Sequence, residues 1–312
     1  MEPGNRSELT EFILLGLSSD PSVQTLLFFV FLAIYVMALV GNGLLIMAVK
    51  KDHRLHTPMY FFLANLSLMD ICYTSVIVPK MLGNLLAGKK SISYNGCVLQ
   101  IFFYLFLGQS ECILLAFMAY DRYVAICWPL SYSAVLNKAA CAKMITASWV
   151  AGCIISAVDI GITYRLTFCG PNTIDHFFCE VTSLIQLSCS DVTTNVIMTF
   201  VGGAILLLIP LLLILFSYVQ ILIATKQVTS GRSKVFSTCS SHLIVVVLFY
   251  GTATFMYMRP RHSAEQTDKI VSVFYTVVTP MLNPLIYSLR NREVHCALRT
   301  FIRSPAFPCN RQ

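Results

Sequence analysis

Seven long apolar stretches, separated by shorter polar segments, dominate the pattern of hydrophobic and polar positions along the chain. They cover residues 21–49, 57–78, 91–120, 144–164, 192–225, 235–258 and 270–289. A helix needs about 20 apolar residues to cross a bilayer, and in lipid its backbone polar groups must be satisfied within the segment. The alternating segments of about ten residues that a transmembrane β-barrel requires do not occur in the sequence. The pattern therefore predicts an all-α membrane protein, built as a bundle of seven transmembrane helices.

Composition and charge agree with this prediction. Of the 312 residues, 56% are hydrophobic and 12% are charged, whereas soluble domains average about 25% charged residues. Lys and Arg number 22 against 15 Asp and Glu, a net charge of +7, but the cations lie between the apolar stretches. We therefore do not expect a soluble enzyme, a disordered chain, a small disulfide-bonded protein or a nucleic-acid-binding protein.

The distribution of Lys and Arg predicts the orientation in the membrane. With the N-terminus outside, 14 of these residues fall on the cytosolic side and eight on the outer side, as the positive-inside rule requires. Asn5 begins an N-glycosylation sequon, which suits an outer tail. We expect an extracellular tail over 1–22, a seven-helix domain over 23–290 and a cytoplasmic tail over 291–312.

The cytoplasmic tail is expected to form a short amphipathic helix. Its apolar residues fall at helical spacing, and Arg side chains beside them can reach lipid headgroups. The apolar positions are Val294, Ala297, Leu298 and Phe301, and the basic ones are Arg292, Arg299 and Arg303.

The chain has 12 cysteines, and many of them lie in the predicted helices, where small apolar packing is expected. Four lie on the predicted outer side: Cys97, Cys169, Cys179 and Cys189. Four cysteines allow three pairings, and the residues alone do not choose among them. A bond from Cys97 to the loop after the fourth helix would hold that loop over the bundle as a lid.

Four motifs in order identify a family. Residues 55–63 read LHTPMYFFL, 118–127 read MAYDRYVAIC, 234–242 read KVFSTCSSH and 280–291 read PMLNPLIYSLRN. Together they closely resemble the olfactory (odorant) receptors, which are rhodopsin-like (class A) G-protein-coupled receptors, and the match covers nearly the whole chain. One departure is Trp128, where the family most often has His, and its effect on coupling is open.

The resemblance implies a function and a mechanism. A small volatile odorant would bind within the bundle of a plasma-membrane receptor and activate a stimulatory G protein of the olfactory type, which raises cAMP in sensory neurons. Cys97 would pair with Cys179, and Cys169 with Cys189. Arg122 would pair with Asp121 at rest and be freed as the sixth helix moves outward. The residues of this G-protein switch would be Asp121, Arg122, Tyr123, Tyr218, Asn283, Pro284 and Tyr287.

Two buried carboxyls on the predicted helices raise the question of a metal ion. Cys97, Tyr104, Glu111 and Arg122 lie on nearly one face of the third helix, since a helix turns about 100° per residue. Glu111 and Asp70 would thus lie in the middle of the bundle, where a bound sodium ion, a shared proton or protonation of one or both carboxyls would compensate them. Metal binding by the stretch 176–180, which has been suggested for odorant receptors, is not expected, because a disulfide-bonded Cys179 is no thiolate ligand.

The helical register also predicts a ligand chamber on the outer half of the bundle. Its residues are mostly apolar with a few hydroxyls, which fits a small, weakly polar ligand. Amine receptors carry an Asp where Tyr104 stands, and Arg259 and Arg261 at the outer mouth leave a carboxylic acid open. The glycines would either set the size limit of the ligand or allow close helix packing. The predicted chamber residues are Tyr104, Leu105, Gly108, Gln109, Cys112, Val181, Gly202, Gly203, Leu206, Tyr250, Ala253, Thr254, Tyr257, Tyr275 and Thr279.

Two other classes of protein were weighed against a receptor. A transporter or channel is disfavoured by the odd number of spans and by the lack of an inverted repeat in the sequence. An intramembrane enzyme could use Asp70 and Glu111 as a dyad, but the receptor motifs account for both residues. We expect a receptor that is not an enzyme and that needs no cofactor apart from a sodium ion.

Overall fold

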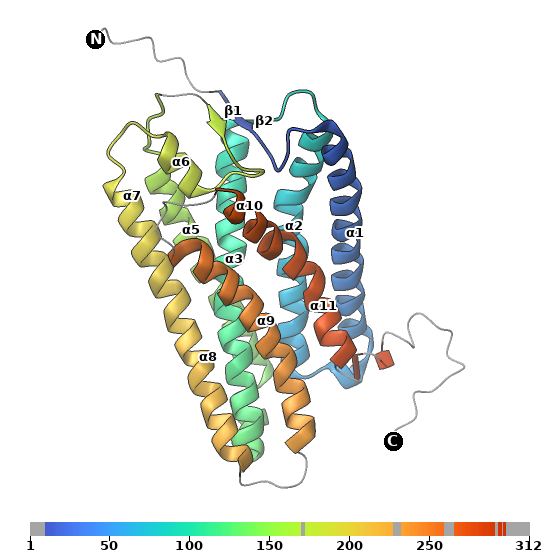
Figure 1. Cartoon of the computed structure of the whole chain (residues 1–312). Coiled ribbons are helices and arrows are strands. Elements are labelled where there is room, and N and C mark those ends of the chain that lie inside the picture. Colours follow the sequence, from blue (N-terminus) through green and yellow to red (C-terminus); the bar gives the residue numbers. More distant parts are fainter. Residues whose placement is uncertain are drawn as a thin grey trace.

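The structure is a computed structural model that describes residues 10–169, 172–226, 232–258, 265–290, 293–294 and 296–297. Within these residues, seven helical segments are long and apolar enough to cross a membrane, as the sequence predicted. They lie side by side as one bundle (Figure 1). The segments are Pro21–Lys51, Pro58–Leu86, Tyr94–Cys127, Lys138–Thr163, Thr193–Lys226, Cys239–Met256 and Thr267–Ser288.

The spans correspond to the labelled elements as follows. The first four are α1 (Pro21–Lys51), α2 (Pro58–Leu86), α3 (Tyr94–Cys127) and α5 (Lys138–Thr163). The fifth joins α7 (Thr193–Ile197), the π-helical turn η3 (Met198–Gly202) and α8 (Gly203–Lys226). The sixth is α9 (Arg232–Met258), and the seventh joins α10 (Glu265–Val273), the π-helical turn η4 (Phe274–Val278) and α11 (Thr279–Arg290). Short turns are η1 (His53–Leu55), η2 (Pro129–Ser131), α4 (Tyr132–Val135) and α6 (Val181–Leu187).

Local sequence signals fix where several helices begin. Asp20 caps α1, since its Oδ1 accepts a hydrogen bond from Ser22 N at 2.7 Å, and proline follows at the first helical position. Ser93 caps α3 by accepting from the amide of Gly96, and Asn137 caps α5. Each cap satisfies an amide that would otherwise lack a partner at a helix start. The third helix therefore begins at Tyr94, inside its apolar stretch, and the fourth begins at Lys138, six residues before its own.

A small sheet closes one end of the bundle. Strand β1 (Glu11–Leu14) pairs antiparallel with β2 (Ser91–Ser93) and parallel with β3 (Thr173–Ile174), in the order β2-β1-β3. Residues 11–14, expected to belong to a tail, are thus the central strand of a sheet. Phe12 is fully buried there, in a cluster that includes Cys97 and Cys179. We call this end of the bundle, which holds the Cys97–Cys179 bond, the disulfide end. The opposite end, where α3 ends shortly after Arg122, is called the arginine end (Figure 1).

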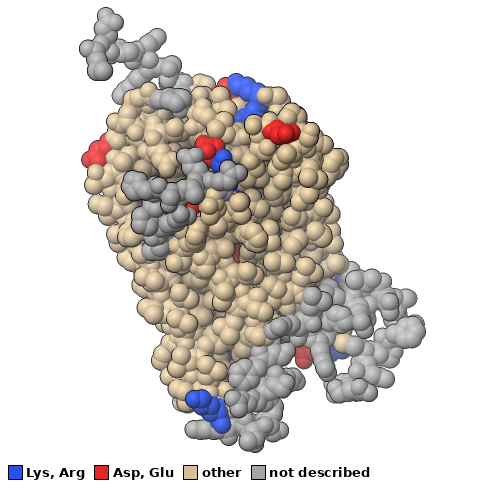
Figure 2. Space-filling model, in the orientation of Figure 1, with Lys and Arg blue, Asp and Glu red and all other residues tan. Residues whose placement is uncertain are grey.

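On the face shown in Figure 2, the charged residues lie toward the two ends of the molecule, and the wall between them is uncharged over most of its height. Large apolar side chains are exposed along this wall, as in Phe29, Leu212 and Val247. A broad apolar band is what hydrocarbon contact requires of a membrane bundle. Ionisable residues inside the bundle are instead buried, and they include Asp70 and Glu111.

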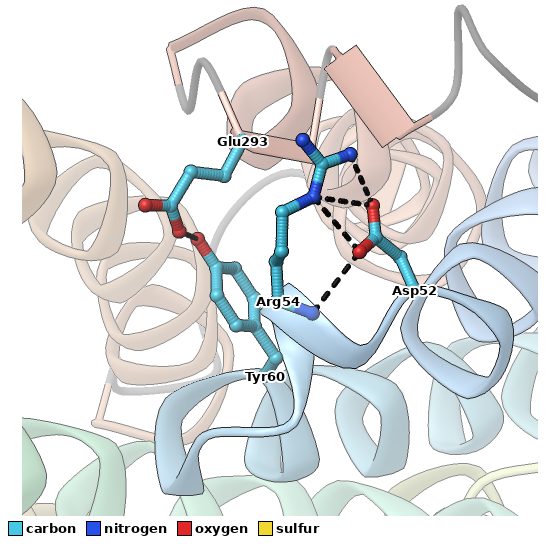
Figure 3. A network of polar contacts seen from close by, with 4 residues as sticks. All are labelled: Asp52, Arg54, Tyr60 and Glu293. Carbon is cyan, nitrogen blue, oxygen red and sulfur yellow. Dashed lines mark hydrogen bonds and ion pairs between the residues drawn. The ribbon is translucent and has the colours of Figure 1, made fainter.

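A polar network ties the chain beyond α11 to the rest of the arginine end. Tyr60, in the first turn of α2, donates a hydrogen bond from its hydroxyl to Glu293 at 2.7 Å. Beside it, Arg54 makes a bidentate ion pair with Asp52, the residue that follows the last turn of α1 (Figure 3). The hydrogen bond from Arg54 lowers the pKa of Asp52. Val294 and Ala297 of the predicted amphipathic helix are buried against the core, and the rest of that prediction lies outside the described residues.

Candidate functional site

A cavity of about 340 Å³ lies within the half of the bundle nearer the disulfide end. Its walls come from α2, α3, α5, the fifth span, α9 and η4, and the segment after Cys179 contributes to its lining. Both π-helical turns contribute lining residues, and such turns are frequent at functional sites. The residues lining the cavity are Tyr73, Tyr104, Leu105, Gly108, Gln109, Cys112, Ile154, Ile155, Val158, Asp159, Glu180, Val181, Thr182, Met198, Thr199, Gly202, Gly203, Leu206, Leu207, Phe249, Ala253 and Tyr275.

Most of the predicted chamber residues line this cavity. They are Tyr104, Leu105, Gly108, Gln109, Cys112, Val181, Gly202, Gly203, Leu206, Ala253 and Tyr275. Three others are not among the described lining residues. Tyr250 is buried and donates its hydroxyl to the backbone oxygen of Cys112 at 2.8 Å. Thr279 is buried beyond the π-helical turn, whose wider turn shifts the face that follows it, and Thr254 is beside Ala253 on α9. The side chain of Tyr257, like Arg259 and Arg261, lies outside the described residues.

The fourth helix is the wall that sequence reasoning missed. Ile154, Ile155, Val158 and Asp159 of α5 all line the cavity. This helix is apolar nearly all round, so its sequence pattern marks no inward face. One signal was available, because Asp159 is the single charged residue in the apolar stretch 144–164.

The cavity is mostly apolar but has a polar wall between α3 and α5. The side-chain amide of Gln109 donates from Nε2 to Asp159 Oδ2 at 3.1 Å, and Gln109 Oε1 accepts from Ser156 Oγ at 3.0 Å. On the other side, the hydroxyls of Tyr104 and Tyr275 are hydrogen-bonded to each other. The cavity thus combines an apolar body with a few fixed polar groups, the usual composition of a small-molecule site.

The glycines of the bundle fall into two groups. A Cβ added at Gly202 or Gly203 would meet no described atom within 4 Å, and one at Gly108 would lie 3.6 Å from Tyr73 Cε2. At Gly152, by contrast, a Cβ would lie 2.2 Å from Ser110 Oγ and 2.8 Å from the backbone oxygen of Phe106. Gly152 therefore permits the close approach of α5 to α3, whereas the other three leave open space at the cavity.

Two disulfide bonds hold the segment that covers the cavity. Cys97 at the start of α3 is bonded to Cys179, and Cys169 is bonded to Cys189, which is the pairing that the resemblance implies. The amide of Cys179 also donates to Gln100 Oε1 at 2.9 Å. No group of three or more His, Cys, Asp or Glu within the described residues is arranged to hold a metal ion.

A polar cluster lies in the middle of the bundle. Asn283 of α11 donates from Nδ2 to both carboxylate oxygens of Asp70, at 3.1 and 3.0 Å. Asn42 of α1 donates to the backbone oxygen of Pro280 at 2.9 Å. The Oδ1 atoms of Asn42 and Asn283 are buried with no hydrogen-bond donor among the described residues. Glu111 is buried in the same bundle, and its exposed fraction is 4%.

The arginine end holds an ion pair whose two side chains are both largely buried. Asp121 is 1% exposed, and its Oδ2 lies 3.9 Å from Arg122 Nε. Its other oxygen accepts a hydrogen bond at 2.8 Å from Tyr132 of α4. Tyr132 was not predicted as a partner, because nothing in the sequence shows that the turn after α3 folds back onto Asp121.

Two further side chains near this end are linked across helices. Tyr218 of α8 and His242 of α9 are both buried and share a hydrogen bond of 2.7 Å between Oη and Nδ1. The partner of Tyr218 in this structure is therefore His242, not Arg122. Tyr123 accepts a hydrogen bond from the indole of the exposed Trp128 at 3.1 Å.

A seven-helix membrane bundle with a covered cavity at one end and the Asp121–Arg122 pair at the other has the architecture of a rhodopsin-like receptor. A family model described as olfactory receptor matches residues 31–304. The human olfactory receptors 13D1 and 2G6 are 51% and 48% identical to this chain, over 96% and 98% of it and over 87% and 98% of their own lengths. The mouse olfactory receptor 5AP2 is 50% identical over 96% of both chains.

The chain belongs to the olfactory receptor family. Members of this family are G-protein-coupled receptors that respond to odorants and are not enzymes. Family membership also disfavours the alternative of a transporter or channel.

Proposed function

We propose that the cavity is the odorant site and that its occupation is transmitted along α3 and α9 to the G protein. The observation that carries this proposal is that one helix serves both regions: α3 lines the cavity with Tyr104 and Gly108 and carries Arg122 near its other end. A cavity of about 340 Å³ with a mostly apolar lining suits a small volatile molecule. The G protein would be of the stimulatory olfactory type, so that odorant raises cAMP.

The contacts between α3 and α9 support a route for the signal. Cys112 lines the cavity, and its backbone oxygen accepts the hydrogen bond from Tyr250 of α9. Further along α9, His242 is bonded to Tyr218 of α8. An odorant that shifts α9 at the cavity would therefore strain the Tyr218–His242 bond. Release of that bond would let Tyr218 turn to Arg122, and an ion pair at the edge of the bundle is a two-state element that a partner helix can bias.

The orientation and the ends of the chain complete this proposal. The positive-inside count supports an extracellular N-terminus with a glycan on Asn5, and a cytoplasmic tail that contacts membrane lipid. The division into 1–22, 23–290 and 291–312 goes with this orientation. Treatment of intact cells with a glycosidase should increase the gel mobility of wild type and leave Asn5→Gln unchanged, whereas an unchanged wild type would contradict the outer tail.

A volatile-library screen with a cAMP readout tests the function. Cells that display the receptor should respond to at least one small apolar volatile, and Arg122→Ala should abolish the response at equal surface density. Arg165→Ala is the matched control, because Arg165 is an exposed arginine at the disulfide end. A full response in Arg122→Ala, or no response of wild type to any volatile, would overturn the proposal.

We also propose that the polar cluster binds a sodium ion in the resting receptor. Asp70 supplies a buried carboxylate, and the unpartnered Oδ1 atoms of Asn42 and Asn283 are oxygen acceptors of the kind that hard cations prefer. Bound sodium would favour the resting state, so replacement of external sodium by a large organic cation should raise basal cAMP. Asp70→Asn should remove this dependence. An equal sodium effect in Asp70→Asn and wild type would contradict the site.

A further inference from the structure

The charge of the cavity differs from what its apolar composition suggests. Among the described lining residues, two are acidic, Asp159 and Glu180, and none is Lys, Arg or His. Lys269, a cation outside the cavity lining, forms an ion pair of 2.6 Å with Asp175 of the segment that covers the cavity. The cavity therefore offers two carboxyl groups to a ligand and no basic side chain to balance them within the described residues.

The two carboxyl groups are not equivalent. Glu180 accepts hydrogen bonds at Oε1 from Thr182 and from Ser183, both in the short helix α6. Asp159 has one partner among the described side chains, the amide of Gln109 at Oδ2. Ile155 and Val158 line the cavity on the same helix. Asp159 thus belongs to the polar wall, is flanked by apolar side chains of its own helix, and has an oxygen, Oδ1, with no hydrogen-bond donor among the described side chains.

A positively charged ligand would satisfy the Asp159 carboxylate best. A carboxylate in apolar surroundings is costly unless it is paired, and an alkylammonium group brings a positive charge and N–H donors with no acceptor of its own. A charge-assisted hydrogen bond is about twice as strong as a neutral one. An alcohol could also donate a hydrogen bond to the carboxylate, but it would bring no positive charge to offset that of Asp159. A ketone or ester would place an acceptor against an acceptor.

We propose that this receptor is tuned to small volatile amines, with Asp159 as the counter-ion of the ligand's ammonium group and the apolar walls enclosing its hydrocarbon part. The inference rests on the proposed function, because it takes the cavity as the odorant site. Amine receptors carry an Asp at the position of Tyr104, and the lack of that Asp therefore does not exclude an amine ligand here. In this receptor the carboxylate would come from the fourth transmembrane helix, α5, where Asp159 is hydrogen-bonded to Gln109 of α3.

Matched volatiles that differ in one functional group test the proposal in the intact receptor. Cyclohexylamine, cyclohexanol and cyclohexanone share one ring, and pentylamine and pentanol share one chain. Dose–response curves for cAMP would be recorded in buffered medium at equal surface density, with mock-transfected cells as the blank. The amines should be effective at concentrations at least tenfold below those of their alcohol and ketone partners.

Variants of the two carboxyl groups then assign the effect. Asp159→Asn keeps the shape and an acceptor for the bond from Gln109, and it should remove the amine preference by lowering the amine response at least tenfold more than the alcohol response. Asp159→Glu should retain the preference, and the matched control is Asp191→Asn, which removes an exposed carboxyl outside the cavity lining and should leave the preference unchanged. Loss of the preference in Glu180→Gln but not in Asp159→Asn would overturn the assignment to Asp159, and stronger responses to the ketone than to the amine would overturn the ligand class.

The outcomes separate this inference from the proposed function. If neutral volatiles activate the receptor and amines are no better, the inference fails and the odorant site stands. If neither group of volatiles evokes a response from receptor at the cell surface, both fail. If Asp159→Asn fails to reach the cell surface while Asp159→Glu is expressed normally, wild type and Asp159→Glu are compared over the matched volatiles. An amine preference in both would support the inference, and its absence from both would overturn it.

Discussion

Two glycines allow the proposed role of the cavity in odorant binding to be distinguished from a role of the glycines in close helix packing. Gly108 of α3 lines the cavity, and a Cβ there would lie 3.6 Å from Tyr73 Cε2, an ordinary van der Waals separation. Gly152 of α5 faces α3, and a Cβ there would lie 2.2 Å from Ser110 Oγ. The substitutions Gly108→Ala and Gly152→Ala add the same methyl group, but the first fills ligand space and the second collides with a neighbouring helix.

The expected effects differ in kind and in size. A methylene that misfits a pocket costs about 1–3 kcal/mol, or roughly 10- to 200-fold in discrimination. Gly108→Ala should therefore weaken the response to odorants that fill this corner by that factor and spare smaller ones, and Gly108→Leu should extend the loss to most ligands. Overpacking at Gly152 costs about 1–3 kcal/mol of folding free energy, so Gly152→Ala should lower surface expression for every ligand alike.

The assay is a set of cAMP dose–response curves over a graded series of odorant sizes, normalised to receptor at the cell surface. A change in size selectivity at normal surface density is the result expected for Gly108→Ala. Unchanged selectivity in Gly108→Leu, or a loss of surface density in Gly108→Ala as large as that in Gly152→Ala, would refute the placement of Gly108 at the odorant.

Three further predictions concern the covering segment and the arginine end. Cys97→Ser and Cys179→Ser should each abolish surface expression, because a native disulfide commonly contributes about 2–5 kcal/mol; normal surface staining of both variants would argue against a structural bond. Burial lowers the pKa of His176 below its ordinary value of 6.5, so the unfolded chain takes up a proton as pH falls below that value while the folded one resists it. The melting temperature of purified receptor should therefore fall as the pH is lowered from 7 to 5, and it should fall less in His176→Asn. An equal fall in wild type and variant would show that protonation of His176 is not the cause. Tyr60→Phe removes the hydrogen bond to Glu293 and should cost about 1–3 kcal/mol of stability with odorant potency unchanged, which a thermal-shift assay measures; an unchanged melting temperature would show that the bond contributes nothing.

The number and placement of the helices were accessible from the sequence, because each span is a run of apolar residues long enough for lipid. The ends of the spans were less so. The third helix continues to Cys127 through Asp121 and Arg122, which the bundle partly buries, and the fourth begins at Lys138, where Asn137 supplies a cap. Hydropathy detects the part of a helix that meets hydrocarbon, whereas hydrogen-bonded caps decide where it begins and ends.

The candidate site was predictable where one face of a helix is marked by polar residues. On α3, the spacing of Tyr104, Glu111 and Arg122 marked the inward face, and Tyr104, Gly108 and Cys112 line the cavity. On α5 no such stripe exists, so Asp159 was not assigned to the cavity. Strand β1 was missed for another reason, since its partners come from two distant segments of the chain.

The most direct test of the central claim is the structure of the receptor bound to an odorant from the screen and to its G protein. Cryo-electron microscopy should show odorant density enclosed by Tyr104, Gly108 and Leu206, with Arg122 released from Asp121 toward the G protein. Density for the odorant on the lipid-facing wall or at the disulfide end outside the cavity, or an Arg122–Asp121 pair intact in the active complex, would contradict the account.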